Sequence, residues 1–184
     1  MSTDPQTPTS DASPGELVGY FHETLRHLGT GDLANLRRAS IHSGYVSATL
    51  YKILNQSASH QHHPLLQPYH ERQWGELLSH MAHDTEQRPQ GERRSLGSAM
   101  AEADVSELRL TRLLNAPARD EQGGREGRIP LHEELGRTLG ILRSKGVLVR
   151  WSDVAQLIFS SSEQAEKLRR RIARDYYNHL HHNS

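Results

Sequence analysis

The chain has 184 residues, with 22 basic and 22 acidic side chains and a hydrophobic content of only 34%. This length allows one or two small domains with a modest core, and the zero net charge argues against a simple, uniformly basic nucleic-acid binder. The absence of cysteine excludes a disulfide scaffold, a Cys-ligated zinc site and a thiol nucleophile. No apolar run approaches the ~20 residues of a membrane span, and the polar N-terminus lacks the apolar core of a secretory signal. We therefore expect a cytoplasmic protein with no membrane partner.

The N-terminal part of the chain predicts a disordered tail followed by a capped helix. Residues 1–12 are rich in Thr, Ser, Pro and Asp, a composition typical of disorder. Ser13, Pro14 and Glu16 suit the N-cap, N1 and N3 positions of a helix. That helix should continue to about Leu28, because its apolar residues recur at helical spacing.

The remaining elements of this half complete a predicted N-terminal bundle over residues 13–86. Their assignment depends on apolar residues at helical spacing and on turn-forming residues between them. In chain order they are a short helix capped by Asp32, a helix over 45–54, a loop over 56–68, a helix over 71–83 and a polar linker over 85–94.

A second helical bundle is predicted over residues 95–182. Ser95 and Ser106 suit the N-cap positions of two short helices. The apolar run 147–149 is interpreted as a connector, because no second strand pattern lies nearby. The helix that Ser106 caps should bury Leu110, Leu113 and Leu114. The elements that follow are a charged loop over 117–128, a helix from Pro130 to Gly146, and helices over 151–159 and 162–180. The fold class is therefore predicted to be all-α, as two small helical bundles.

The segment from Ser95 to Trp151 offers cationic rather than catalytic chemistry. It holds no nucleophile beside a base, no metal-ligand cluster and no phosphate-binding glycine loop. All but three of the 22 basic residues of the chain are arginine, whose planar fork suits phosphate and nucleobases. A GC-rich genome would explain this bias equally well. We expect a protein without a cofactor that lies along a phosphate backbone and is not an enzyme.

Several short motifs, taken in order, resemble those of a known family. An L-R-R run follows Gly31-Asp32 in the N-terminal half, and the denser part of the pattern begins at Ser95. Its pieces are Leu36-Arg37-Arg38, Ser95-Leu96-Gly97, Ala99-Met100-Ala101, Glu107-x-Arg109 with Leu113, Leu135-x-Arg137, and Trp151 at the start of the next helix. This pattern, from Leu17 to Tyr177, resembles the small subunit of the type I-E CRISPR surveillance complex (CasB, the Cascade small subunit).

The resemblance implies a non-catalytic subunit that stabilises the R-loop between guide RNA and target DNA through sequence-independent backbone contacts. The implied partners are the crRNA, the target and displaced DNA strands, the CasA- and CasC-type subunits, and a second copy of the chain arranged head to tail. This chain departs from the family just before its last helix, where Ser160-Ser161-Ser162 stands in place of basic residues. The cations further along that helix could substitute for them.

Ten basic side chains are candidate contacts to nucleic acid, and each has a plain structural alternative. The alternatives are complementation of a helix dipole, a surface ion pair, or a solvated helix flank. Arg137, for example, is spaced to pair with Glu133 and Glu134. The four cations of the last helix are expected to share one face, beside acidic residues that could neutralise them. The candidates are Arg37, Arg38, Arg109, Arg112, Arg137, Arg143, Lys167, Arg170, Arg171 and Arg174.

A helix-turn-helix transcriptional regulator is the alternative reading of the C-terminal region. The predicted helices over 151–159 and 162–180 would form the helix pair. Against this reading, the turn between them is serine-rich, and the second helix presents bulky cations where base readout prefers a variety of Asn, Gln and Ser.

The 13 histidines raise the question of a metal site. Three of them, His60, His62 and His63, lie in the predicted loop, and His179, His181 and His182 lie at the C-terminus. The helical set is His80, His83 and Asp84. Because the chain has no Cys and no H-E-x-x-H spacing, we predict no functional metal.

Overall fold

The computed structural model describes residues 14–38, 47–56, 63–84, 93–117, 130–160 and 162–182. Within these ranges the chain forms helices, joined by short connections and one isolated bridge between Arg94 and Val149. The all-α prediction is therefore confirmed. The predicted disorder of residues 1–12, and most of the predicted loops over 56–68, 85–94 and 117–128, lie outside the described residues.

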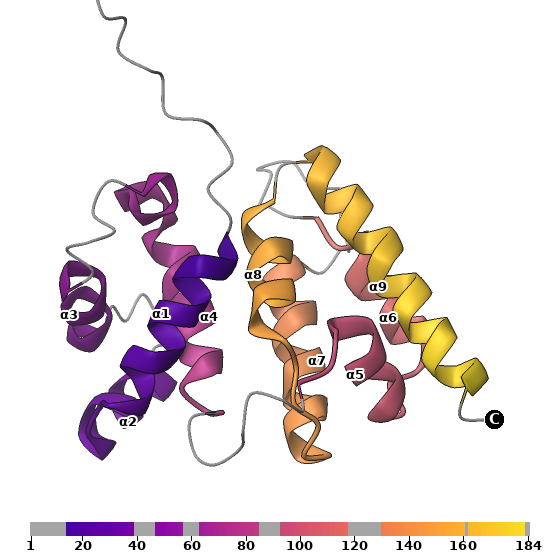
Figure 1. The fold of residues 1–184 in the computed structure, drawn as a ribbon, viewed down its shortest axis with the longest axis horizontal. Helices are drawn as coiled ribbons and strands as arrows, with labels where there is room; N and C mark the ends of the chain where they lie inside the picture. The colour runs from indigo at the N-terminus through magenta and orange to yellow at the C-terminus, as the bar shows by residue number, and fades with distance from the viewer. Residues whose placement is uncertain are drawn as a thin grey trace, which may run out of the picture.

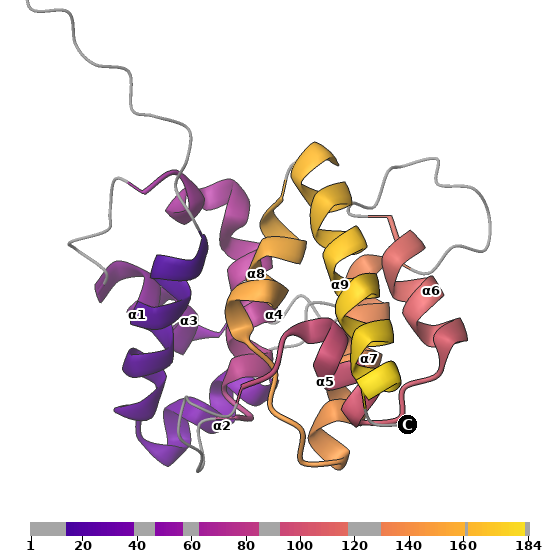
Figure 2. The same cartoon turned by 45° about the vertical axis from the view of Figure 1, so that its right-hand side comes forward.

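The described residues contain nine α-helices and two short 3₁₀ turns. In chain order they are α1 Pro14–Arg26, α2 Thr30–Arg38, α3 Ala48–Gln56, 3₁₀ turns Pro64–Leu66 and Pro68–His70, α4 Glu71–Met81, α5 Leu96–Glu102, α6 Glu107–Asn115, α7 Leu131–Ser144, α8 Trp151–Phe159 and α9 Ser162–His182. Figure 1 shows α1 to α4 on one side of the molecule and α5, α6 and α9 on the other, with α7 and α8 between them. Figure 2 shows the same fold turned by 45°.

The predicted cap at Asp32 is wrong. Helix α2 already begins at Thr30, and the Leu33 amide donates to the Gly29 carbonyl at 3.1 Å, so Asp32 lies inside the first turn. Its carboxylate instead accepts hydrogen bonds from Thr49 Oγ1 and Lys52 Nζ, each at 3.0 Å. Asp32 therefore joins α2 to α3, because its carboxylate binds side chains of α3 instead of capping the amides of its own helix.

The C-terminal end of the predicted loop over 56–68 forms a 3₁₀ turn, Pro64–Leu66. His63 Nδ1 accepts the Leu65 amide at 3.2 Å and caps the first 3₁₀ turn. The indole of Trp74 in α4 donates to the Leu65 carbonyl at 2.6 Å. A proline at the start of each turn supplies a suitable φ angle. The segment is therefore packed onto α4.

One connected apolar core runs through both halves of the chain. Phe21 of α1, Trp74 of α4 and Phe159 of α8 meet at ring-centroid distances of 4.7 and 4.6 Å. Helix α8 packs against α1 and α4 on one side and against α9 on the other. The buried residues of α1, α4, α5, α7 and α8 belong to the same cluster. The boundary between two independently folding bundles stays a prediction.

The end of the predicted polar linker is fixed in place rather than free. The Arg94 amide donates to the Leu148 carbonyl at 2.9 Å, and the Arg150 amide donates to the Arg94 carbonyl at 2.7 Å. The Arg93 guanidinium donates to the Val149 carbonyl at 3.2 Å and to His22 Nε2 at 2.8 Å. Residues 147–149 form a connector, as predicted, but this connector pairs with the chain before α5.

Candidate nucleic-acid interface

The ten candidate cations lie on four helices that fall into two regions. Helix α2, with Arg37 and Arg38, packs against α3 and α4 in the N-terminal half. The other candidates lie on α6, α7 and α9, and α6 packs against both α7 and α9. Figure 1 places α2 at the opposite end of the molecule from α6 and α9. The structure therefore does not bring the α2 pair together with the candidates on α6 and α9, whereas Arg143 at the end of α7 lies near the C-terminal end of α4, which α2 also contacts.

Arg109 and Arg112 are available on α6. This helix buries Leu110 and Leu113, and its outer positions face solvent. Arg109 is half-buried and Arg112 is exposed, and the spacing of three residues places them one above the other. Within the described residues, neither guanidinium forms a hydrogen bond or an ion pair. Ser106 stands at the predicted N-cap of α6, but its side chain makes no capping hydrogen bond.

Arg137 on α7 is occupied by the two carboxylates that its spacing predicted. Its guanidinium lies 3.3 Å from Glu133 Oε2 and 3.3 Å from Glu134 Oε1. Glu134 is only 2% exposed, and its Oε2 has no hydrogen-bond partner in the described part of the chain. A buried carboxylate that loses its cation is costly. Arg137 therefore has a structural role, whatever else it contacts.

Arg143 lies at the end of α7, near the C-terminal end of α4. The side chain is exposed, and within the described residues it forms no ion pair. Its positive charge acts on a histidine of α4: burial, together with the charges of Arg143 and His83, lowers the pKa of His80 to about 4. Arg143 therefore lies at the contact between the two halves of the chain.

Helix α9 carries three cations on its outward face. Its inward face consists of the buried residues Ala165, Leu168, Ile172 and Tyr176. We call the exposed set Lys167, Arg170 and Arg174 the α9 stripe. Lys167 pairs with Glu163 at 2.8 Å and Arg170 pairs with Glu166, whereas Arg174 has no partner within the described residues. Ion pairs this exposed contribute little to stability and can exchange for a phosphate.

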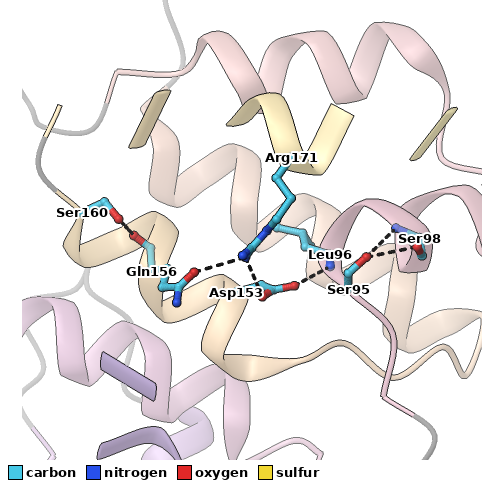
Figure 3. Close-up of polar contacts among 7 residues, drawn as sticks. All are labelled: Ser95, Leu96, Ser98, Asp153, Gln156, Ser160 and Arg171. Atoms are coloured by element: carbon cyan, nitrogen blue, oxygen red, sulfur yellow. Dashed lines mark hydrogen bonds and ion pairs between the residues drawn. The ribbon is translucent and has the colours of Figure 1, made fainter. Parts of the chain in front are cut away.

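Arg171 does not belong to the α9 stripe, because its side chain is engaged by α8 although its spacing places it on the same helix face as Lys167 and Arg174. Its guanidinium turns toward α8 and donates to Asp153 Oδ1 at 2.9 Å and to Gln156 Oε1 at 3.1 Å (Figure 3). The other oxygen of Asp153 accepts the Leu96 amide at 3.2 Å. At 100° per residue, Arg171 lies about 100° around the helix from Arg170, and its side chain extends to the acceptors on α8. It therefore joins α9 to α8 and α5.

On α2, one of the two candidate arginines is hydrogen-bonded to the end of another helix. Arg37 Nε donates to the carbonyl of Ala82, the C-cap residue of α4, at 2.9 Å. Arg38 is exposed, and in the described ranges it has no hydrogen bond or ion pair. The carbonyls at a helix C-terminus attract a cation, so Arg37 stabilises the end of α4.

Sequence reasoning missed two residues that lie in this region, Arg169 and Tyr177. Arg169 donates to the Ala116 carbonyl at 2.9 Å and ties α9 to the end of α6. In the sequence, Arg169 directly follows Leu168 of the apolar face, and this position indicates an arginine at the edge of the buried face. Tyr177 is 41% exposed at the C-terminal end of the α9 stripe.

The described residues bring no three metal-ligating side chains together. His63, His80, His83 and Asp84 are among these residues, whereas His60 and His62 lie outside them. No described helix combines the length and apolar character that a membrane crossing requires.

A family model described as CRISPR-associated protein Cse2 matches residues 32–177. The match begins in α2 and ends in α9, so it includes every helix that carries a candidate cation. No curated protein and no solved structure matches the chain.

Proposed function

Because the chain belongs to the family of CRISPR-associated protein Cse2 and is accordingly a subunit of a CRISPR Cascade complex, we propose that it stabilises the R-loop through sequence-independent backbone contacts. It acts in a type I-E complex in the cytoplasm, as a non-catalytic subunit. Its nucleic-acid partners are the crRNA and both strands of the target DNA, and its protein partners are the CasA- and CasC-type subunits and a second copy of itself. The family match gives no support to a helix-turn-helix regulator.

The observation that carries this proposal is that Arg109 and Arg112 have no acidic partner among the described residues. Arg137 and Arg171 are engaged with buried carboxylates, and Arg37 is engaged with a backbone carbonyl. By contrast, Arg109 and Arg112 project from one short helix with no acidic partner among the described residues. A guanidinium without a carboxylate is free to form charge-assisted hydrogen bonds with phosphate.

Few such contacts are needed. The RNA–DNA heteroduplex of an R-loop is about as stable as the DNA duplex that it replaces, so protein contacts to the backbone can shift the balance. Backbone contacts carry no sequence information, which suits a subunit that must accept any target. The zero net charge of the chain agrees with a protein whose other faces pack against neighbouring subunits.

The test is the dissociation of target DNA from a complex reconstituted with Arg109→Ala plus Arg112→Ala. We expect roughly tenfold faster dissociation and a smaller salt dependence, because each phosphate contact contributes ~0.7–0.9 to the log–log slope. Arg26→Ala plus Lys52→Ala is the matched control, since it removes two exposed, ion-paired cations from the other half. Normal assembly with unchanged dissociation would remove the α6 pair from the interface.

A further inference from the structure

Tyr177 extends the α9 stripe by one further turn. The side chain is 41% exposed, and its ring meets the ring of Tyr176 edge-on, with centroids 5.3 Å apart and planes at 89°. Tyr176 itself is buried, and its hydroxyl donates to the Val105 carbonyl at 2.6 Å. A fixed ring therefore contacts Tyr177 on one side. This contact lowers the entropy that the exposed ring would lose on binding a ligand.

The neighbours of Tyr177 on the helix surface include one cation and no carboxylate. Residues three and four positions away are the neighbours that share a helix face. For Tyr177 these include the exposed Arg174 and His181, and Arg170 follows one turn further back. Successive members of this row are separated by roughly 4–6 Å along the helix axis.

Two acidic groups near the start of α6 lie toward Tyr176. Burial raises the pKa of the Tyr176 hydroxyl, and the charges of Glu107 and Asp104 raise it further. These carboxylates therefore lie near the buried end of Tyr176, where α6 begins. Arg174 forms no ion pair with any described carboxylate.

Tyr51 shows that exposure alone would not single out Tyr177. Its side chain on α3 is 40% exposed, almost the same as Tyr177. The Tyr51 hydroxyl, however, donates to Glu71 Oε2 at 3.1 Å, and its neighbour Lys52 is paired with Asp32. Tyr51 thus lies beside a carboxylate that would repel phosphate, whereas Tyr177 lies one turn from Arg174, which has no acidic partner among the described residues.

We propose that the α9 stripe and Tyr177 bind single-stranded nucleic acid, with phosphates on Arg170 and Arg174 and an unpaired base stacked on the Tyr177 ring. Grooves that bind single strands combine cations for the backbone with aromatic rings for the bases, and this stacking tolerates any sequence. A paired base offers no free face, so Tyr177 selects an unwound strand over a duplex. The inference rests on the proposed function and adds to it the class of strand that α9 binds.

The test compares two strands of equal length and charge on the full-length protein. One is an ordinary single-stranded oligonucleotide, and the other is an abasic strand with the same phosphates. The wild type should bind the base-bearing strand about tenfold more tightly. Tyr177→Ala and Tyr177→Leu should bind it only as tightly as the abasic strand, whereas Tyr177→Phe and the exposure-matched Tyr51→Ala should behave as wild type. Thermal unfolding by circular dichroism confirms that each variant is folded.

The outcomes separate this inference from the proposed function. Equal, salt-dependent affinity of the wild type for both strands would overturn base stacking and leave the backbone function intact. No binding of either strand would remove both proposals. A preference for bases that survives in folded Tyr177→Leu would overturn the assignment to this residue. Its loss in Tyr177→Phe would overturn a role for the ring itself.

Discussion

Gly97 in α5 lies so close to α9 that a Cβ atom at this position would be 2.1 Å from the carbonyl oxygen of Ile172. The same atom would be 2.9 Å from the Tyr176 amide nitrogen. Both neighbours are backbone atoms, which cannot rotate aside as a flexible side chain can. The small residues that follow Ser95 therefore let two helix backbones come into direct contact, and α5 packs along α9 (Figure 2).

Gly97→Ala should lower the free energy of unfolding by about 2–3 kcal/mol, because the two helices must move apart. Urea denaturation measures this change. Gly140→Ala on the exposed face of α7 is the control, since no atom lies within 4 Å of its added Cβ. That substitution should stabilise the protein by up to about 1 kcal/mol through helix propensity. Equal stability of the wild type and Gly97→Ala would contradict the close contact.

The ion pair between Asp153 and Arg171 should be energetically coupled. Asp153 is 3% exposed and also accepts the Leu96 amide, so Asp153→Ala removes the acceptor for two donors. We expect Asp153→Ala to cost about 2–3 kcal/mol. Arg171 is partly exposed, so solvent screening should limit Arg171→Ala to about 1 kcal/mol.

A double-mutant cycle of these two substitutions should give a coupling of about 1 kcal/mol. Lys167→Ala is the comparison, because its pair with Glu163 is exposed at both ends. This control should change the unfolding free energy by less than about 0.5 kcal/mol. Strict additivity of Asp153→Ala and Arg171→Ala would rule out the contact.

Arg137→Ala should destabilise the fold, whereas Arg109→Ala should not. Without Arg137, the buried Glu134 carboxylate loses the only cation that contacts it in the described residues. We expect a loss of about 1 kcal/mol after solvent screening of the exposed guanidinium. Adding Glu134→Gln to Arg137→Ala should restore part of this loss, since a neutral amide does not need a cation. If thermal unfolding shows no rescue, charge compensation is not the role of Arg137.

Stability should also depend on the protonation of Glu76 in α4. Burial raises its pKa to about 7 from an ordinary 4.5, an effect that Arg72 only partly offsets. Between these two values the folded state binds the proton more tightly than the unfolded state does. This contribution is therefore fully present below pH 4.5 and is lost as the pH rises through about 7.

Glu76→Gln removes this dependence, because the amide resembles the protonated acid at every pH. The stability of Glu76→Gln relative to wild type should increase from pH 4.5 to pH 8, by on the order of 1–3 kcal/mol. Urea denaturation at a series of pH values measures the difference. A difference that stays constant over this range would show that Glu76 titrates normally.

The sequence alone determined the all-α class and the approximate positions of most helices. These features depend on residues close together in the chain. Apolar residues at helical spacing mark the buried faces of α4, α7 and α8. Ser95 accepts the Ser98 amide at 3.4 Å, as its predicted capping role requires. The pairing of Arg137 with Glu133 and Glu134 was also predictable, because all three lie on one helix face.

Only the tertiary structure decided which cations remain available. Arg171, Arg37 and Asp32 each found partners at distant positions in the sequence: Asp153 on α8, the Ala82 carbonyl at the end of α4, and Thr49 and Lys52 on α3. Helical periodicity gives the direction of a side chain around its own helix but not what the neighbouring helix presents there. A guanidinium is neutralised or left free by that neighbour. The free state of Arg109, Arg112 and Arg174 among the described residues thus follows from how the helices pack.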